Sequence, residues 1–337
     1  MIYIVLFFLV FSVLLYVLLA GADFGAGVLE LFSSKENQAV TKKTLYRVMG
    51  PVWEANHIWI IISIVILWVA FPLFYNVLVV SLHIPITLML LGITLRGVAF
   101  VFRHYDAFID RSQIVYDWMF RISSLVTPIF IGMIFGALLS GKIIIGNNQN
   151  TFFELYISGW FNLFSILIGI FFTSLCTFLA AILLIGESDA TTRKVYVKKA
   201  RIATVSVVLL GFISLSYGYF TNNTFIGIFV ESKWALAIVI LSGILLFPLW
   251  WSIKNQRRIY SRFFAGVQVI CILAAAFIPI FPELIFTKTS SINLLENIAP
   301  NSTIRVLGIT LIIGGTIILP GLFHLLKSFK MIKILER

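Results

Sequence analysis

Long apolar segments occupy most of this chain, and only short polar connections separate them. Nine of these segments are long enough to cross a bilayer, since a spanning helix needs ~20 mostly apolar residues. Backbone polar groups surrounded by lipid must be satisfied within their own segment, so each run is expected to be a helix. Hydrophobic residues make up 60% of the 337 residues and charged residues only 12%, which excludes a soluble globular domain. The sequence therefore predicts an all-α, polytopic integral membrane protein.

The predicted helices form a single transmembrane domain over residues 1–337, because no connection is long enough to fold by itself. The first run is expected to be a spanning helix and not a cleaved signal peptide, since no basic residue precedes it. A tight reversal between the second and third helices is expected between Phe71 and Asn76. The nine spans are predicted near 2–31, 49–73, 76–102, 114–140, 156–185, 202–220, 233–252, 260–281 and 304–326.

Basic residues are distributed unequally between the two ends of these spans. Of the 25 Lys and Arg residues, twenty lie on the side of the first, third, fifth and seventh connections and the C-terminal tail. Four lie on the other side, and Arg96 lies within a span. Because Lys and Arg are enriched in cytoplasmic connections, the N-terminus is expected outside and the C-terminus inside a cell (inner) membrane. The net charge of +11 is explained by this distribution, so nucleic-acid binding is not expected.

Three ionisable residues, Asp23, Glu54 and Arg96, lie inside apolar runs, where a charge costs at least a few kcal/mol. Counting residues from the predicted helix ends places all three roughly 8–12 Å from the inner boundary. Two interpretations follow. A buried carboxyl group can take up and release protons, which favours a proton or ion path from the cytoplasm. Alternatively, the acids and the arginine only form ion pairs that hold helices together.

His57 lies three residues after Glu54, on the same face of the predicted helix. It could extend a proton relay, ligate a haem, or make a hydrogen-bonded contact between helices. The two cysteines, Cys176 and Cys271, both lie in apolar runs and suit neither a disulfide framework nor a metal site. No metal site is predicted.

Three motifs carry a resemblance to a known family. They read GADFGAG at Gly21–Gly27, PVWEANHIW at Pro51–Trp59 and LRGVAFVFR at Leu95–Arg103. In this order they resemble subunit II of cytochrome bd-type quinol oxidases. Length and helix number agree across nearly the whole chain, and the match is most specific in the first four helices.

The resemblance implies a terminal oxidase of aerobic respiration, a complex that oxidises a membrane quinol and reduces oxygen to water. Its subunit I carries haems b and d, and this chain would scaffold that obligate partner without binding haem itself. Asp23 and Glu54 occupy positions of acids in a cytoplasmic proton-uptake path, with His57 beside them. Arg96 and Arg103 match basic positions and are expected to form structural ion pairs. A structural quinone and a small single-helix subunit are left open, and no residue marks a cofactor site.

The chain departs from the family pattern at three positions. Ala20 stands where many members have an acid, Glu54 replaces the usual Asp, and His57 replaces a common Gln or Glu. Two other functions stay open from the buried ionisable residues themselves. One is a proton- or cation-coupled secondary transporter, although such proteins often place their site at the midplane between inverted repeats. The other is a purely structural subunit that conducts nothing.

Overall fold

The structure is a computed structural model that describes residues 1–34, 38, 41–46, 50, 53–105, 111–146, 150–188 and 190–328. Several residues used in the sequence analysis lie outside these ranges. They are Pro51 and Val52 of the second motif, the basic residues Lys35 and Arg47, and the tail from 329 onward.

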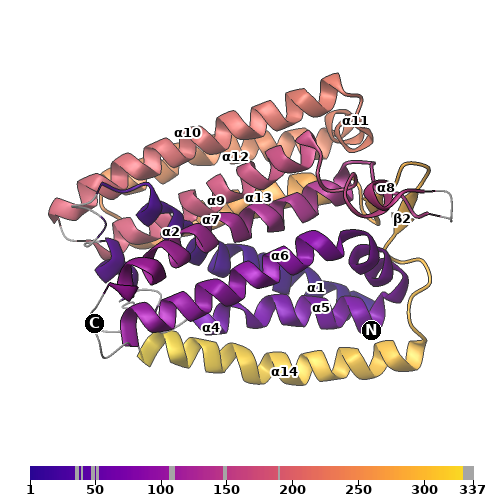
Figure 1. The fold of residues 1–337 in the computed structure, drawn as a ribbon, viewed down its shortest axis with the longest axis horizontal. Coiled ribbons are helices and arrows are strands. Elements are labelled where there is room, and N and C mark those ends of the chain that lie inside the picture. Colours follow the sequence, from indigo (N-terminus) through magenta and orange to yellow (C-terminus); the bar gives the residue numbers. More distant parts are fainter. Residues whose placement is uncertain are drawn as a thin grey trace.

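Nine helices in the described part of the chain are long and apolar enough to cross a membrane, which confirms the predicted number. Figure 1 shows their axes lying roughly parallel to the longest axis of the molecule. Because nine is an odd number of crossings, the N-terminus and the end of the last helix lie at opposite ends of the bundle. The spans are Ile2–Leu31, Trp53–Ala70, Pro72–Arg103, Ser112–Leu139, Leu163–Glu187, Thr192–Phe220, Lys233–Lys254, Arg258–Phe277 and Asn301–His324.

The first span changes its winding in the middle. It consists of α1 (Ile2–Leu15), one π-helical turn η1 (Tyr16–Ala20) and α2 (Gly21–Leu31). Short π-helical turns within α-helices are often found at functional sites. Every residue of α2 except Leu31 is buried, so this half of the span lies inside the bundle.

The second and third spans meet at a tight reversal. The second comprises α4 (Trp53–Asn56) and α5 (Ile58–Ala70), and the third is α6 (Pro72–Tyr105). Phe71 leaves the helical conformation (φ −128°, ψ 61°), and Pro72 starts α6, where its fixed φ suits the first helical position. Asn76 lies inside α6, so the reversal comes earlier than predicted.

Two predicted boundaries differ from the structure for identifiable reasons. Helix α7 (Ser112–Leu139) is followed by the short helix α8 (Phe152–Tyr156) and then by α9 (Leu163–Glu187). The Asn162 side chain accepts the Ser165 N–H and so starts α9 as a new helix, separate from α8. The predicted span at 156 therefore began too early. The predicted span at 202 began too late, because α10 runs over Ala190–Phe220. Its basic first turns lie in the part of the helix that can extend beyond the bilayer.

The rest of the chain adds helices at the edge of the bundle and a small sheet. The helices are α11 (Thr224–Glu231), α12 (Lys233–Lys254), α13 (Arg258–Phe277) and α14 (Asn301–Ser328). Strands β1 (Glu283–Phe286) and β2 (Ser291–Asn293) pair antiparallel before α14. α14 lies along the outside, next to α1 and α5, whereas α7 and α9 are the most buried spans. The middle of the bundle thus consists of α7 and α9 with α2 packed against both, and α6 packs against α7.

Candidate functional site

Two helices bring four charged side chains into the middle of the bundle. α2 carries Asp23 and Glu30, and α6 carries Arg96 and Arg103. Within each helix the two residues are seven positions apart, which is close to two full turns. Both acids therefore lie on one face of α2 and both arginines on one face of α6, ~10 Å apart along each axis. Facing each other, they form a ladder with two rungs, which we call the ion-pair ladder.

The inner rung, which is the one deeper in the bundle, joins Asp23 to Arg96. Arg96 Nη1 donates to Asp23 Oδ2 at 2.7 Å and Nη2 donates to Oδ1 at 2.7 Å, a bidentate contact. Nη2 also lies 3.1 Å from the Asp23 backbone oxygen, and Nε donates to Ser124 Oγ of α7 at 3.0 Å. Asp23 is 0% and Arg96 1% exposed, so the pair is sealed from solvent and from lipid.

Aromatic rings cover the guanidinium groups of the ladder. The Arg96 guanidinium lies 5.1 Å from the centre of the Phe24 ring and 4.9 Å from that of Phe120. The Arg103 guanidinium lies 4.4 Å from the centre of the same Phe120 ring. Cations over aromatic faces gain about 2 kcal/mol or more where water is excluded. The rings thus offset part of the cost of burying two arginines.

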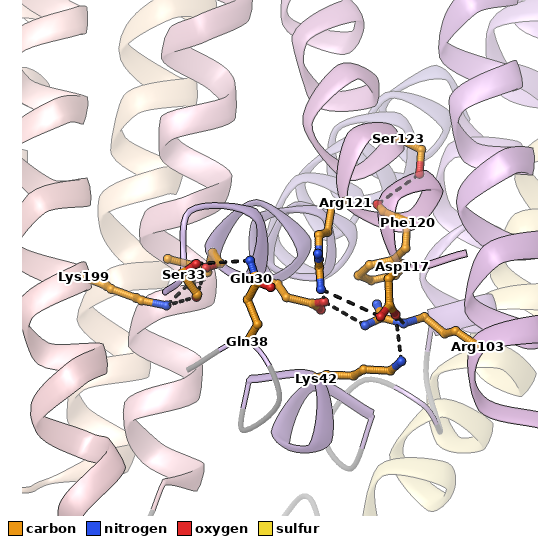
Figure 2. Close-up of polar contacts among 11 residues, drawn as sticks. Glu30, Ser33, Gln38, Lys42, Arg103, Asp117, Phe120, Arg121, Ser123 and Lys199 are labelled. Atoms are coloured by element: carbon orange, nitrogen blue, oxygen red, sulfur yellow. Dashed lines mark hydrogen bonds and ion pairs between the residues drawn. The ribbon is translucent and has the colours of Figure 1, made fainter. Parts of the chain in front are cut away.

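The outer rung is larger and more branched, as Figure 2 shows. Glu30 Oε1 accepts from Arg103 Nη2 at 2.8 Å and from Arg121 Nε of α7 at 2.9 Å. Arg103 Nε lies 3.0 Å from Asp117 Oδ1, also on α7. Glu30 Oε2 is buried and has no hydrogen-bond partner among the residues that the structure describes. One oxygen of this carboxylate therefore still has its capacity to accept a hydrogen bond.

Partly exposed residues continue the ladder toward the end of the bundle. Lys42 Nζ lies 2.7 Å from Asp117 Oδ1, and these two side chains are 28% and 22% exposed. On the other side of α2, Lys199 Nζ donates to the Leu29 carbonyl at 3.1 Å and to the Ser33 hydroxyl. Charged groups thus extend from the surface to the outer rung, and both arginines of the ladder contact the apolar ring of Phe120.

Removing the outermost cation should have a small effect on stability. We expect Lys42→Ala to lower the free energy of unfolding by only about 0.2–1 kcal/mol, because its partner Asp117 is partly solvated and retains Arg103. Denaturant unfolding in detergent would measure the difference. A loss above about 2 kcal/mol would mean that Lys42 belongs energetically to the buried part of the network.

The structure brings Asp23 and Arg96 together but not Glu54. The Glu54 side chain is exposed on α4 and takes part in none of the ion pairs among the described residues. Asn56, two residues on, is buried, and residues two apart on a helix point to nearly opposite sides. The expectation that two carboxylates and Arg96 meet at one level is therefore wrong for Glu54. Glu30 supplies the second buried carboxylate, one rung farther out.

His57 lies at the inner end of the ladder. Its ring centre is 6.0 Å from that of Tyr16 in η1 and 5.9 Å from that of Phe24 in α2. His57 Nδ1 and the Tyr16 hydroxyl are both buried and have no hydrogen-bond partner within the described ranges. In that same part of the chain, no cluster of His, Cys, Asp and Glu could hold a metal ion.

Glu30, Asp117 and Arg121 were not predicted as site residues. Glu30 was missed because it lies next to the predicted end of the first span, where a charge needs no explanation. Arg121 was counted among the cations of a connection, as was Arg103, but both are buried within helices. A usable signal was present, since the seven-residue spacing of the acids matches that of Arg96 and Arg103.

Comparison with known proteins gives a consistent result. The sequence model of the family described as cytochrome bd terminal oxidase subunit II matches residues 1–329. Cytochrome bd ubiquinol oxidase subunit 2 of Bacillus subtilis is 27% identical over 292 residues, covering 85% of this chain and 82% of that protein. Cytochrome bd-I ubiquinol oxidase subunit 2 of Escherichia coli K12 is 24% identical, covering 80% and 77%. The fold is similar to a chain of the bd oxidase from Geobacillus thermodenitrificans, with a TM-score of 0.75 at 17% identity, covering 97% and 98% of the two chains.

Proposed function

Because the chain belongs to the subunit II family of cytochrome bd terminal oxidases, we propose that it is the scaffolding subunit of a complex that oxidises membrane quinol and reduces oxygen to water. The family match over residues 1–329 is the observation that carries this proposal. The obligate partner is a subunit I that holds haems b and d, and this chain binds no haem itself. The basic end of the bundle faces the cytoplasm, with the N-terminus outside, because Lys and Arg gather at that end.

The ion-pair ladder is proposed to be the cytoplasmic part of a proton-uptake path. Its outer members, Lys42 and Asp117, are partly exposed at the basic end, and its inner member Asp23 is sealed. Glu30 lies between them with one oxygen that has no described partner. A carboxylate has about four acceptor sites, so Asp23 and Glu30 can each accept from water while they remain paired with arginine. Buried waters that bridge such groups would complete the path.

Glu54 of α4 and His57, which lies between α4 and α5, are proposed to join this path. His57 Nδ1 and the Tyr16 hydroxyl are buried polar atoms without a described partner, and they continue the polar column beyond Asp23. Glu54 is exposed in the isolated chain. We propose that subunit I covers Glu54, so that it becomes a buried acid only in the complex.

The family match favours the oxidase over the secondary transporter that the residues left open. The placement of the charges agrees with this preference. The ladder lies in the half of the bundle nearer the basic end, whereas transporter sites typically lie at the midplane.

Neutralising the inner rung as a pair tests whether it conducts protons. We expect Asp23→Asn/Arg96→Gln to lower quinol-oxidase turnover per haem about ten-fold or more, since a positioned proton-transfer group contributes at least that much. Removing both charges leaves neither of them buried and unpaired, so the complex should still assemble. Turnover would be measured on purified complex, with haem b and d absorption giving the amount of assembled enzyme.

A second ion pair provides the matched control. Arg262 Nη2 lies 2.6 Å from Glu187 Oε1, a contact between α9 and α13 that is apart from the ladder. Glu187→Gln/Arg262→Gln removes the same two charges and should leave turnover unchanged. Full turnover in the Asp23/Arg96 variant would reject proton conduction through the ladder. The same turnover measurement on Glu54→Gln tests whether Glu54 belongs to the path. Purified chain without a haem-bearing partner would reject the oxidase assignment itself.

A further inference from the structure

A cavity of about 720 Å³ lies between α10 and α12 at the basic end of the bundle. Its lining comes from the first half of α10, from the last five residues of α12 and from Gln256 just beyond it. None of the residues of the ion-pair ladder line it. α10 packs mainly against α9, and α12 packs mainly against α13.

The cavity carries a strong positive charge. Arg193, Lys194 and Arg201 of α10 and Lys254 of α12 all line it, and no Asp or Glu is among the described residues that do. Arg193 Nη1 donates to Gln256 Oε1 at 2.6 Å, a neutral partner. Arg193 Nε is buried and has no hydrogen-bond partner in the described part of the chain. Four cations therefore line one cavity with no acidic residue among its described lining, and Arg193 has a buried donor without a partner in that part of the chain.

The deeper side of the cavity is apolar. Val197 and Val205 follow Arg193 and Arg201 at four-residue intervals, so cations and valines form one stripe along α10. Trp250 and Ile253 of α12 line the opposite wall. The lining residues farthest from the basic end, Val205 and Trp250, are apolar, and the cations lie nearer that end with Val197 among them. A lipid has a similar order, because its charged headgroup lies above its acyl chains.

We propose that this cavity binds an anionic phospholipid of the phosphatidylglycerol type, with its phosphate among the four cations and an acyl chain against Val205 and Trp250. Arg and Lys donors match phosphate oxygens through charge-assisted hydrogen bonds. Basic pockets between spanning helices on the cytoplasmic side are typical sites for anionic headgroups. The apolar wall favours the lipid over free phosphate, because an inorganic ion would leave that wall uncovered.

The test compares lipid retention by two variants of equal charge. We expect Arg201→Gln/Lys254→Gln to weaken phosphatidylglycerol binding about thirty-fold, since each basic side chain near an anionic headgroup contributes roughly five-fold. The control is Lys198→Gln/Arg258→Gln. It removes two exposed cations, one from α10 and one from the start of α13, and neither of them lines the cavity. Native mass spectrometry of the detergent-solubilised protein, with whatever subunits copurify, would count retained phosphatidylglycerol against phosphatidylcholine.

A third variant tests the acyl-chain site with all charges intact. Val205 is half exposed, so Val205→Trp should fold normally and fill the apolar side of the cavity, lowering phosphatidylglycerol retention about ten-fold. Equal loss in the cavity and control variants would overturn the proposal in favour of general surface attraction. Displacement of phosphatidylglycerol from the protein by inorganic phosphate would also overturn the proposal. Because lipid retention is measured without turnover, a failure of the lipid-binding proposal can be distinguished from a failure of the oxidase assignment.

Discussion

Asp23→Asn is expected to lower the stability of the protein by about 3–5 kcal/mol, because it leaves a buried guanidinium without its counter-charge. Arg96 donates three of its hydrogen bonds to Asp23, two to the carboxylate and one to the backbone oxygen. After the substitution the cation keeps only neutral partners, which are the backbone oxygen of residue 23, the amide oxygen of the new side chain, Ser124 Oγ and the rings of Phe24 and Phe120. These neutral groups cannot replace a carboxylate in a site closed to solvent.

A double-mutant cycle with Arg96→Gln measures the coupling. Asp23→Asn/Arg96→Gln should recover most of the loss, since an amide pair of similar shape carries no net charge into the interior. Glu54→Gln is the control of the same chemistry at an exposed position, and it should change the stability little. Unfolding in detergent, followed by helical circular dichroism, gives the free energies. If Asp23→Asn and Glu54→Gln were equally mild, the inner rung would not be sealed as described.

Gly25→Ala is expected to cost about 3 kcal/mol, at the upper end of the range for overpacking. A Cβ at Gly25 would lie 2.0 Å from the Cys176 carbonyl oxygen and 2.3 Å from its carbonyl carbon on α9. These are backbone atoms, so no side-chain rotation can relieve the clash and α2 must move away from α9. The substitution should also disturb the ladder, because α2 carries both of its carboxylates.

Gly21→Ala supplies the matched comparison one turn earlier on α2. Its Cβ would meet the Cys176 Sγ atom at 3.3 Å, a contact that a side chain can relieve. In the absence of a clash, Gly to Ala favours a helix by about 0.8–1 kcal/mol, so this variant should be near neutral. The difference in unfolding free energy between the two variants is the readout. Equal stability of Gly21→Ala and Gly25→Ala would show that α2 and α9 are not as close as the structure has them.

Parts of the site could be predicted from the sequence because a charge inside an apolar run is a local signal. Asp23 and Arg96 were found in this way, and the structure places them in contact. Glu30 and Arg121 lie near span ends, where charged residues are common, so the same signal did not single them out. Glu54 gave the signal but points away from the bundle.

The number of membrane-spanning helices and the family were determined by the sequence alone. Both depend on features that can be read locally, namely the length of each apolar run and the residues of three short motifs. The ends of α9 and α10 were displaced because caps and helix extension past the bilayer are decided residue by residue.

Which charges meet was decided only by the tertiary structure. Each rung joins residues 73 positions apart, and its geometry depends on how α2, α6 and α7 are rotated about their axes. That rotation is set by close contacts such as Gly25 against the Cys176 backbone, which hydropathy does not encode. A rotation of one residue, about 100°, would turn both carboxylates of α2 away from the arginines. The ladder therefore exists because the packing of small residues fixes the facing sides of helices that are individually specified by their apolar length.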